Sequence, residues 1–193
     1  MKRLKKILIG ILITLAVAIL AMVVFSPYKK HNGFDYKLVK HTIVINVSVD
    51  SLFRYLGNSN NARNWSVYVH HISTLNSDEV KDGLPGSIRR AFCTEDEKGQ
   101  RWDELVTIVE PNKRRQLITY DYIDFSMTAE GLATEQIYQA IDANTSQLTF
   151  TLFFKDHKPT LFEKLKMNFA AYVVLDIYEK NMDNIKRIVE TGK

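Results

Sequence analysis

The chain has 193 residues and a formal charge of +4, from 26 Lys and Arg against 22 Asp and Glu. Four of the basic residues lie within residues 2–6, which contain no acidic residue, so the rest of the chain has no net charge. This balance argues against a nucleic-acid-binding surface, and we interpret the basic runs at 89–90 and 113–115 as solvated strand ends and turns. The single cysteine, Cys93, excludes an intrachain disulfide and a multi-cysteine metal site, and we expect a buried, unreactive thiol.

The first predicted element is a membrane anchor at residues 7–25, behind a basic flank at 1–6. The run carries no charge, and only Gly10 and Thr14 interrupt its apolar residues. At about 1.5 Å per residue, a helix of this length nearly spans a hydrocarbon core of about 30 Å. A cleaved signal peptide has a shorter apolar core, and a buried core helix is amphipathic; these are the two alternatives. We expect an uncleaved signal anchor, a polar linker at 26–35 and one folded domain at 36–193.

The orientation of the anchor follows from the basic residues that flank it. Four Lys and Arg residues precede the apolar run, whereas Lys29 and Lys30 follow it. The more basic flank stays on the cytoplasmic side, which predicts a cytoplasmic N-terminus and an extracytoplasmic domain. Because the difference in charge is small, a domain that faces the cytoplasm is the alternative.

The domain is predicted to begin with a β-strand, two short helices and a series of hairpins. A strand rich in β-branched residues covers 36–47, and an amphipathic helix follows at 49–57, capped by Ser48 or Asp50 and ended by Gly57. The Asn-rich stretch 58–64 is a turn or a second short helix. Alternating runs separated by turn residues predict further strands, reached through 65–75 and then at 87–94, 101–109, 115–122, 133–141 and 147–154. Connections of hairpin length indicate an antiparallel sheet.

The last element is a long helix from residue 161 to about 190, without Pro or Gly. Its apolar residues recur at a spacing of three to four and form a broad stripe. A stripe this wide suits a helix that lies in the concave side of a curved sheet. The predicted fold class is therefore α+β, with an apolar cavity between sheet and helix.

Four stretches of this ordered pattern resemble one known superfamily. They are the strand that runs into a helix at 45–56, the tryptophan segment at 64–69, the Gly83 and Gly86 turn followed by 102–106 and Glu110-Pro111, and the helix end at 185–190. Over roughly residues 36–192 the chain resembles the START/Bet v 1-like (SRPBCC) superfamily, and within it the polyketide cyclase/dehydrase-like branch. The resemblance implies a helix-grip fold, in which a curved antiparallel sheet wraps around the C-terminal helix. Because this fold serves lipid carriers, hormone receptors, cyclases and hydrolases, it implies no single activity.

Candidate site residues come from the resemblance and from strand alternation. The resemblance places Trp65 and Tyr68 at the cavity rim, with core packing as the alternative. In the strand 101–109, Trp102 and Glu104 share the face that we assign to the concave side. A carboxylate there has a raised pKa unless it is paired, and we assign Arg90 as its partner. Such a pair would orient a polar ligand head or do acid–base work; an exposed or structural ion pair is the alternative.

Aromatic residues complete the expected lining, with simple core packing as the alternative. We assign five to the cavity: Tyr120, Tyr122, Phe153, Phe169 and Tyr172. We expect no metal site, because neighbouring strand residues such as His70 and His71 point to opposite faces. No phosphate-loop pattern or dinucleotide fingerprint is present, so no cofactor is expected.

The favoured function is a membrane-anchored binding protein for a hydrophobic small molecule, such as a lipid, a quinone or a polyketide-like compound. One alternative is a cyclase/dehydratase- or hydrolase-type enzyme that uses Glu104 with Arg90 or a tyrosine. The other is an envelope interaction module whose own side chains fill the cavity. The sequence indicates neither the ligand nor an oligomeric state.

Overall fold

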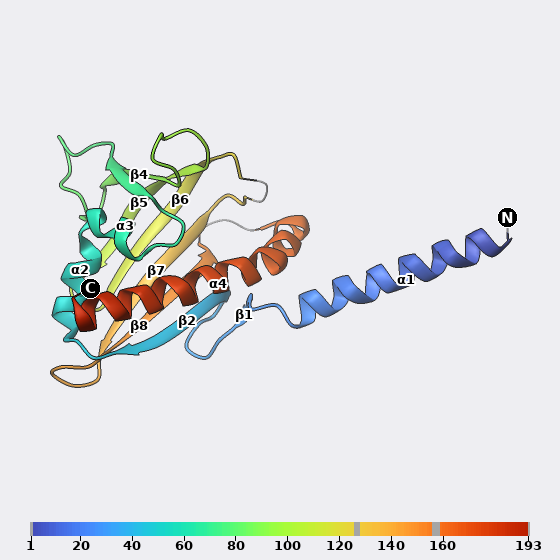
Figure 1. The fold of residues 1–193 in the computed structure, drawn as a ribbon, viewed down its shortest axis with the longest axis horizontal. Helices are drawn as coiled ribbons and strands as arrows, with labels where there is room; N and C mark the ends of the chain where they lie inside the picture. The colour runs from blue at the N-terminus through green and yellow to red at the C-terminus, as the bar shows by residue number, and fades with distance from the viewer. Residues whose placement is uncertain (1, 126–127, 156–158, 193) are drawn as a thin grey trace.

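A curved antiparallel sheet holds one long helix against its concave face (Figure 1). The computed structural model describes residues 2–125, 128–155 and 159–192. Its eight strands lie in the order β1-β2-β8-β7-β6-β5-β4-β3, and every neighbouring pair is antiparallel. The strands are β1 Lys29–Lys30, β2 Lys37–Ile45, β3 His71–Thr74, β4 Ile88–Phe92, β5 Arg101–Glu110, β6 Arg114–Ile123, β7 Leu132–Ala140 and β8 Ser146–Phe154. The predicted α+β helix-grip architecture is confirmed.

Capping residues at the helix ends bind the backbone N–H and C=O groups that have no partner within the helix. They are α1 Lys2–Val24, α2 Val49–Gly57, the 3₁₀ turn η1 Ser59–Asn61, α3 Ala62–Trp65 and α4 Leu161–Thr191. Ser48 caps α2, because its hydroxyl accepts a hydrogen bond from the Ser51 N–H. Thr160 and Glu163 form a reciprocal capping box at the start of α4, and Gly192 ends that helix at a φ of 70°.

Two hydrophobic clusters attach α4 to the sheet, one near each end of the helix. Toward its C-terminus, Met182 and Ile185 pack with Ile45 and Leu148 and with residues of α2. Toward its N-terminus, Met167 and Ala171 pack in a second cluster with Tyr28, Val39, Leu132 and Phe154. Between the clusters, Tyr178 of α4 reaches the sheet, where its hydroxyl donates to the Thr151 carbonyl of β8 at 3.1 Å.

The segment 26–35, expected to be a linker, is packed against the domain. Ser26 and Tyr28 are buried, and β1 pairs with β2. The Ser26 hydroxyl donates to the backbone carbonyl of Asn168 in α4, at 3.0 Å. The Tyr28 ring meets Phe154 edge-on, with ring centroids 6.2 Å apart. The segment was expected to be a linker because most of its residues are polar, but the side chain of Tyr28 is part of the hydrophobic core.

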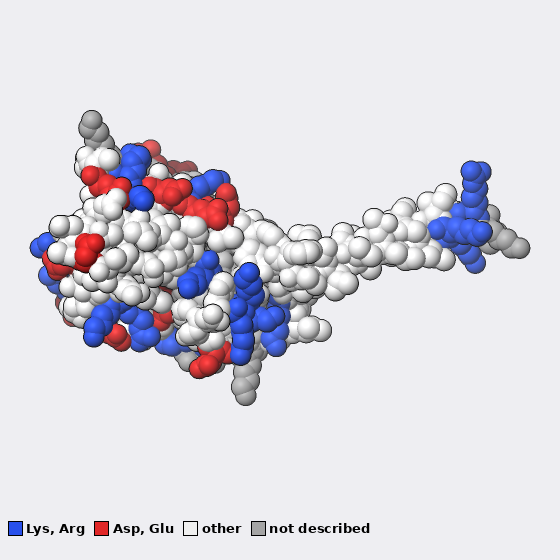
Figure 2. All heavy atoms as spheres, turned by 90° about the horizontal axis from the view of Figure 1, so that it is seen from below, with Lys and Arg blue, Asp and Glu red and all other residues white. Residues whose placement is uncertain are grey.

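The helix α1 extends away from the domain, and its apolar side chains are exposed (Figure 1). In Figure 2 its surface is uncharged except for Lys and Arg side chains at the far end. By length and composition, residues Arg3–Val24 are able to cross a membrane. A helix that exposes apolar side chains on all sides has the character of the anchor expected at residues 7–25.

Met182 tests the C-terminal attachment of α4. This side chain is fully buried, so Met182→Ala removes contacts and leaves a cavity, at a cost of about 2–5 kcal/mol in the free energy of unfolding. The exposed Val173 on the same helix provides the control, and Val173→Ala is expected to change the free energy of unfolding by less than about 0.5 kcal/mol. Urea unfolding followed by tryptophan fluorescence measures both. Equal effects would contradict this packing.

The thiol of Cys93 is expected to react slowly. Burial raises the pKa of Cys93 to about 11, so little thiolate forms at pH 8, and only the thiolate is nucleophilic. Alkylation by iodoacetamide, followed by mass spectrometry, should be slow at pH 8 and accelerate as the pH approaches 11. A rate at pH 8 equal to that of free cysteine would disprove this assignment.

Candidate ligand-binding cavity

A cavity of about 480 Å³ lies between α4 and the concave face of the sheet. Its volume falls within the range of about 300–1,000 Å³ that is typical of small-molecule sites. Most of its wall is apolar and comes from both layers; these residues include Leu117, Leu132, Phe150, Leu152, Met167, Val174 and Ile177. The cavity is therefore suited to an apolar molecule enclosed between sheet and helix.

Local periodicity decides which side chains reach the cavity. On β5, Trp102 and Glu104 point inward, because alternate residues of a strand share a face. The same alternation brings Leu117 and Thr119 from β6. On α4 the lining residues recur at a spacing of three to four: Met167, Ala170, Val174, Ile177 and Asn181.

A buried ion pair forms the polar part of the wall. The Glu104 carboxylate accepts a hydrogen bond from Arg89 Nε at 2.7 Å and another from Trp102 Nε1 at 2.9 Å. Glu104 and Arg89 are each only 7% exposed. The Asp82 carboxylate lies 4.0 Å from Arg89 Nη1 and accepts a hydrogen bond from Ser59. Both oxygens of Glu104 are therefore engaged by donors.

The predicted partner of Glu104 was wrong by one residue. Arg90 is on the outer face, where its guanidinium binds Asp103 through two hydrogen bonds of 2.6 and 2.9 Å. The register pairs Arg89 with Glu104 and Arg90 with Asp103. Because a shift of one residue exchanges the two faces of a strand, the sequence alone left this pairing open across the long β4–β5 loop.

The basic runs expected to be solvated each contribute one buried arginine. Arg89 lines the cavity, and Arg115 is only 3% exposed. Arg115 Nη1 donates to Gln136 Oε1 and to the Tyr138 hydroxyl, both at 3.1 Å. Its guanidinium also lies over the Phe53 ring, 4.4 Å from the centroid. Burial lowers the pKa of Arg115, and these contacts hold the charge beneath α2.

The tyrosines of the cavity wall are neutral hydroxyls at ordinary pH. Burial raises the pKa of Tyr122 to about 12, and its hydroxyl is hydrogen-bonded to Thr119. Burial also raises the pKa of Tyr178, whose hydroxyl donates to the Thr151 carbonyl at 3.1 Å. Such groups suit hydrogen bonding to a ligand better than proton transfer.

The structure brings together half of the residues predicted to bind ligand. Those that line the cavity are Trp65, Tyr68, Trp102, Glu104 and Tyr122. Those on the outer side of the sheet are Arg90, Tyr120 and Phe153, of which Phe153 packs with Leu38 and Ala133. Phe169 and Tyr172 lie on α4 away from the lining residues, and the Tyr172 hydroxyl instead donates to the Met22 carbonyl of α1.

Sequence reasoning missed Arg89 and Asn181 in the wall. Asn181 is 6% exposed, and its side-chain oxygen accepts a hydrogen bond from the Val67 N–H at 2.7 Å. It thereby fixes the loop after α3 to the long helix. An asparagine within the apolar stripe of α4 was the available signal, because a buried amide requires a partner.

The histidine pair differs from the expected arrangement. The Nδ1 atoms of His70 and His71 are 3.0 Å apart, because His70 precedes β3 and strand alternation does not apply to it. His71 Nε2 also meets Glu97 Oε1 at 3.1 Å. Over residues 2–125, 128–155 and 159–192, no group of three His, Cys, Asp or Glu side chains is arranged to hold a metal ion.

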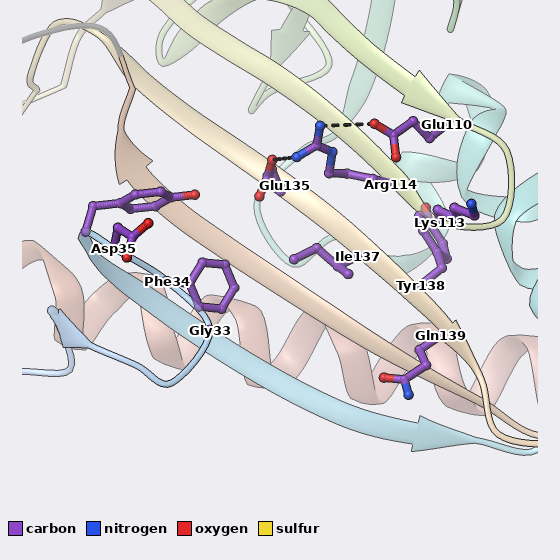
Figure 3. Close-up of a pocket in the computed structure, with 11 residues that line it drawn as sticks. Gly33, Phe34, Asp35, Glu110, Lys113, Arg114, Glu135, Ile137, Tyr138 and Gln139 are labelled. Atoms are coloured by element: carbon purple, nitrogen blue, oxygen red, sulfur yellow. Dashed lines mark hydrogen bonds and ion pairs between the residues drawn. The ribbon is translucent and has the colours of Figure 1, made fainter.

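A second hollow, of about 630 Å³, lies on the outer side of the sheet (Figure 3). It is bounded by the loop 33–36 and by side chains of β6 and β7. Arg114 spans it between Glu110 at 3.1 Å and Glu135 at 3.5 Å. This hollow is open, and Arg114, Glu110 and Glu135 at its border already pair with one another. The inner cavity, whose wall is largely apolar, is therefore the better candidate for an apolar ligand.

Solved structures share this architecture at low sequence identity. The di-domain ARO/CYC BexL from the BE-7585A biosynthetic pathway matches with a TM-score of 0.59 and 11% identity, over 79% of this chain and 46% of that one. The Aha1 dimer from Colwellia psychrerythraea matches with a TM-score of 0.57 and 20% identity, over 81% and 98%. A START superfamily protein from Mycobacterium smegmatis matches with a TM-score of 0.56 and 14% identity, over 79% and 98%. At these identities the likeness shows the fold alone.

The sequence itself was compared with protein families and with curated proteins. None of the curated proteins matches it. One protein family matches residues 37–190 of this chain. This range covers the sheet from β2 onward and nearly all of α4. The chain belongs to the family described as polyketide cyclase / dehydrase and lipid transport.

Proposed function

We propose that this protein is a membrane-anchored binding protein that holds a hydrophobic small molecule between the sheet and α4. The observation that carries the proposal is the cavity of about 480 Å³, whose wall is largely apolar. Transfer of an apolar ligand from water into such a space is favourable in proportion to the area that it buries. A lipid, a quinone or a polyketide-like compound has this chemistry.

The polar part of the wall narrows the ligand to an amphipathic one. Arg89 donates a hydrogen bond from Nε to Glu104. Within the described residues its terminal nitrogens, Nη1 and Nη2, make no hydrogen bond. Asp82 lies 4.0 Å from Nη1, beyond hydrogen-bond distance, so these donors favour an oxygen-rich ligand group at this position. The ligand therefore places its polar head near Arg89 and its apolar body along Leu132, Leu152 and Val174.

The contacts of the wall favour binding over the two alternative functions. A general acid or base needs a free proton-transfer position, whereas both Glu104 oxygens accept hydrogen bonds from Arg89 and Trp102. An interaction module filled by its own side chains would lack an open cavity of this size. The exposed apolar helix α1 supports anchoring to a membrane, and the basic flank before it supports a cytoplasmic N-terminus with the domain outside.

Ala170→Phe tests the cavity directly. Ala170 lines the cavity, so a phenyl group there occupies the ligand's space, and the amount of bound molecule should fall. Asp183→Phe adds the same side chain at an exposed position of α4 and should leave binding unchanged. Native mass spectrometry of the full chain released from detergent micelles, followed by lipid extraction, measures occupancy and identifies the class of molecule. A wild-type chain that carries no molecule, with no thermal shift across lipids, quinones and aromatic polyketides, would refute the proposal.

Glu104→Gln separates a structural ion pair from a catalytic carboxylate. It removes the nearer of the two carboxylates beside the buried Arg89, leaving Asp82 at 4.0 Å, and should lower the free energy of unfolding by roughly 3 kcal/mol. Glu110→Gln on the same strand removes an ion pair with Arg114 that is about half exposed, and should cost less than about 1 kcal/mol. Denaturant unfolding compares the two variants. Loss of a measured turnover in folded Glu104→Gln alone would instead favour the enzyme.

A further inference from the structure

No flexible linker separates α1 from the domain. Only Phe25 separates the end of α1 from Ser26, which is 3% exposed and donates to the Asn168 carbonyl. The Tyr172 hydroxyl donates to the Met22 carbonyl at 2.9 Å, in the last turn of α1, where carbonyls have no partner within the helix. α1 is therefore fastened to α4 at two places, and its direction fixes the orientation of the domain.

The first turn of α4 exposes two large apolar side chains. Leu161 is 85% exposed and Phe162 is 67% exposed. In Figure 1 this turn lies above the end of α1, at the same position along the horizontal axis, whereas the other end of α4 lies beside α2. Phe25, at the end of α1, is 78% exposed. These three side chains are thus presented at the level where a membrane-spanning α1 leaves the hydrocarbon.

Basic residues accompany these apolar side chains. Lys29 and Lys30 in β1 are exposed, and so is Lys164 in the first turns of α4. Figure 2 shows Lys and Arg side chains gathered on the domain beside the base of α1. Apolar side chains flanked by lysines are the features by which a helix binds the surface of a bilayer that contains anionic lipids.

We propose that the first turn of α4 is a second contact with the bilayer that holds α1, made by Leu161 and Phe162 and supported by the nearby lysines. This inference rests on the proposed function, because it requires α1 to span the membrane. The fixed junction places the turn at the bilayer surface. Insertion of its exposed apolar side chains among the lipids is favourable, because it removes them from water. The bilayer is therefore the partner of this surface.

The contact orients the cavity. The lining residues Thr128, Ala129 and Lys166 come from the chain before β7 and from the first turns of α4, the part of the domain nearest the bilayer. Arg89 in β4 and Ser59 in η1 come from elements farther from α1 in Figure 1. An amphipathic molecule in a leaflet keeps its polar head toward water and its apolar part toward the hydrocarbon. The orientation of the domain thus matches the orientation in which such a molecule would leave the leaflet.

Depth-dependent fluorescence quenching tests the contact on the full chain. A single environment-sensitive dye is attached in a Cys93→Ser background, and the protein is reconstituted into liposomes with anionic lipids and acyl-chain quenchers. Three labelled positions are compared: Phe162→Cys, Leu15→Cys within α1, and Asn144→Cys in the β7–β8 turn at the other end of the domain. We expect loss of fluorescence at positions 15 and 162 and none at position 144.

Each other result overturns the inference in a distinguishable way. If position 15 is quenched and position 162 is not, α1 is inserted but the turn does not contact the bilayer, so the inference fails and the anchor stands. If neither is quenched, α1 does not span the membrane, and both fail. Quenching at position 144 as well as at 162 would contradict the proposed orientation.

Discussion

The attachment of α4 to the sheet at two separate clusters is the constraint on which the rest of the structure depends. Met182 and Ile185 hold the helix at one end, and Met167 and Ala171 hold it at the other. The cavity lies between the helix and the concave face, and its wall includes Val174 and Ile177 from the part of α4 between these points.

The sequence predicted the fold well because each element carries its own local signals. Turn residues, alternation and a long three-to-four stripe placed the strands and α4 within a few residues of their observed bounds. The burial of Tyr28 could not be read locally, because a single aromatic residue in a polar segment gives no periodicity. The same limit applies to β1. Its two lysines carry no strand signal, and they form a strand only because they pair with β2.

The candidate site was less predictable, because it depends on relations between elements. Alternation within β5 placed Trp102 and Glu104 on the inner face, but the partner of Glu104 depended on the register with β4. A shift of one residue exchanged Arg89 for Arg90 and moved a buried charge to the other side of the sheet. Likewise, the rotation of α4 decided that Tyr172 meets α1 rather than the cavity, and one sequence does not fix that rotation.

The hydrogen bond from Ser26 to the Asn168 carbonyl has a consequence for transport. A domain on a long tether can travel between two membranes with its cargo, whereas a domain fastened directly to its own anchor cannot reach beyond its own diameter. With α1 in the bilayer and a ligand in the cavity, as we propose, the domain would exchange that ligand only with the adjacent leaflet or with a partner that comes to it. Transfer of the ligand over a longer distance would require that partner to carry it.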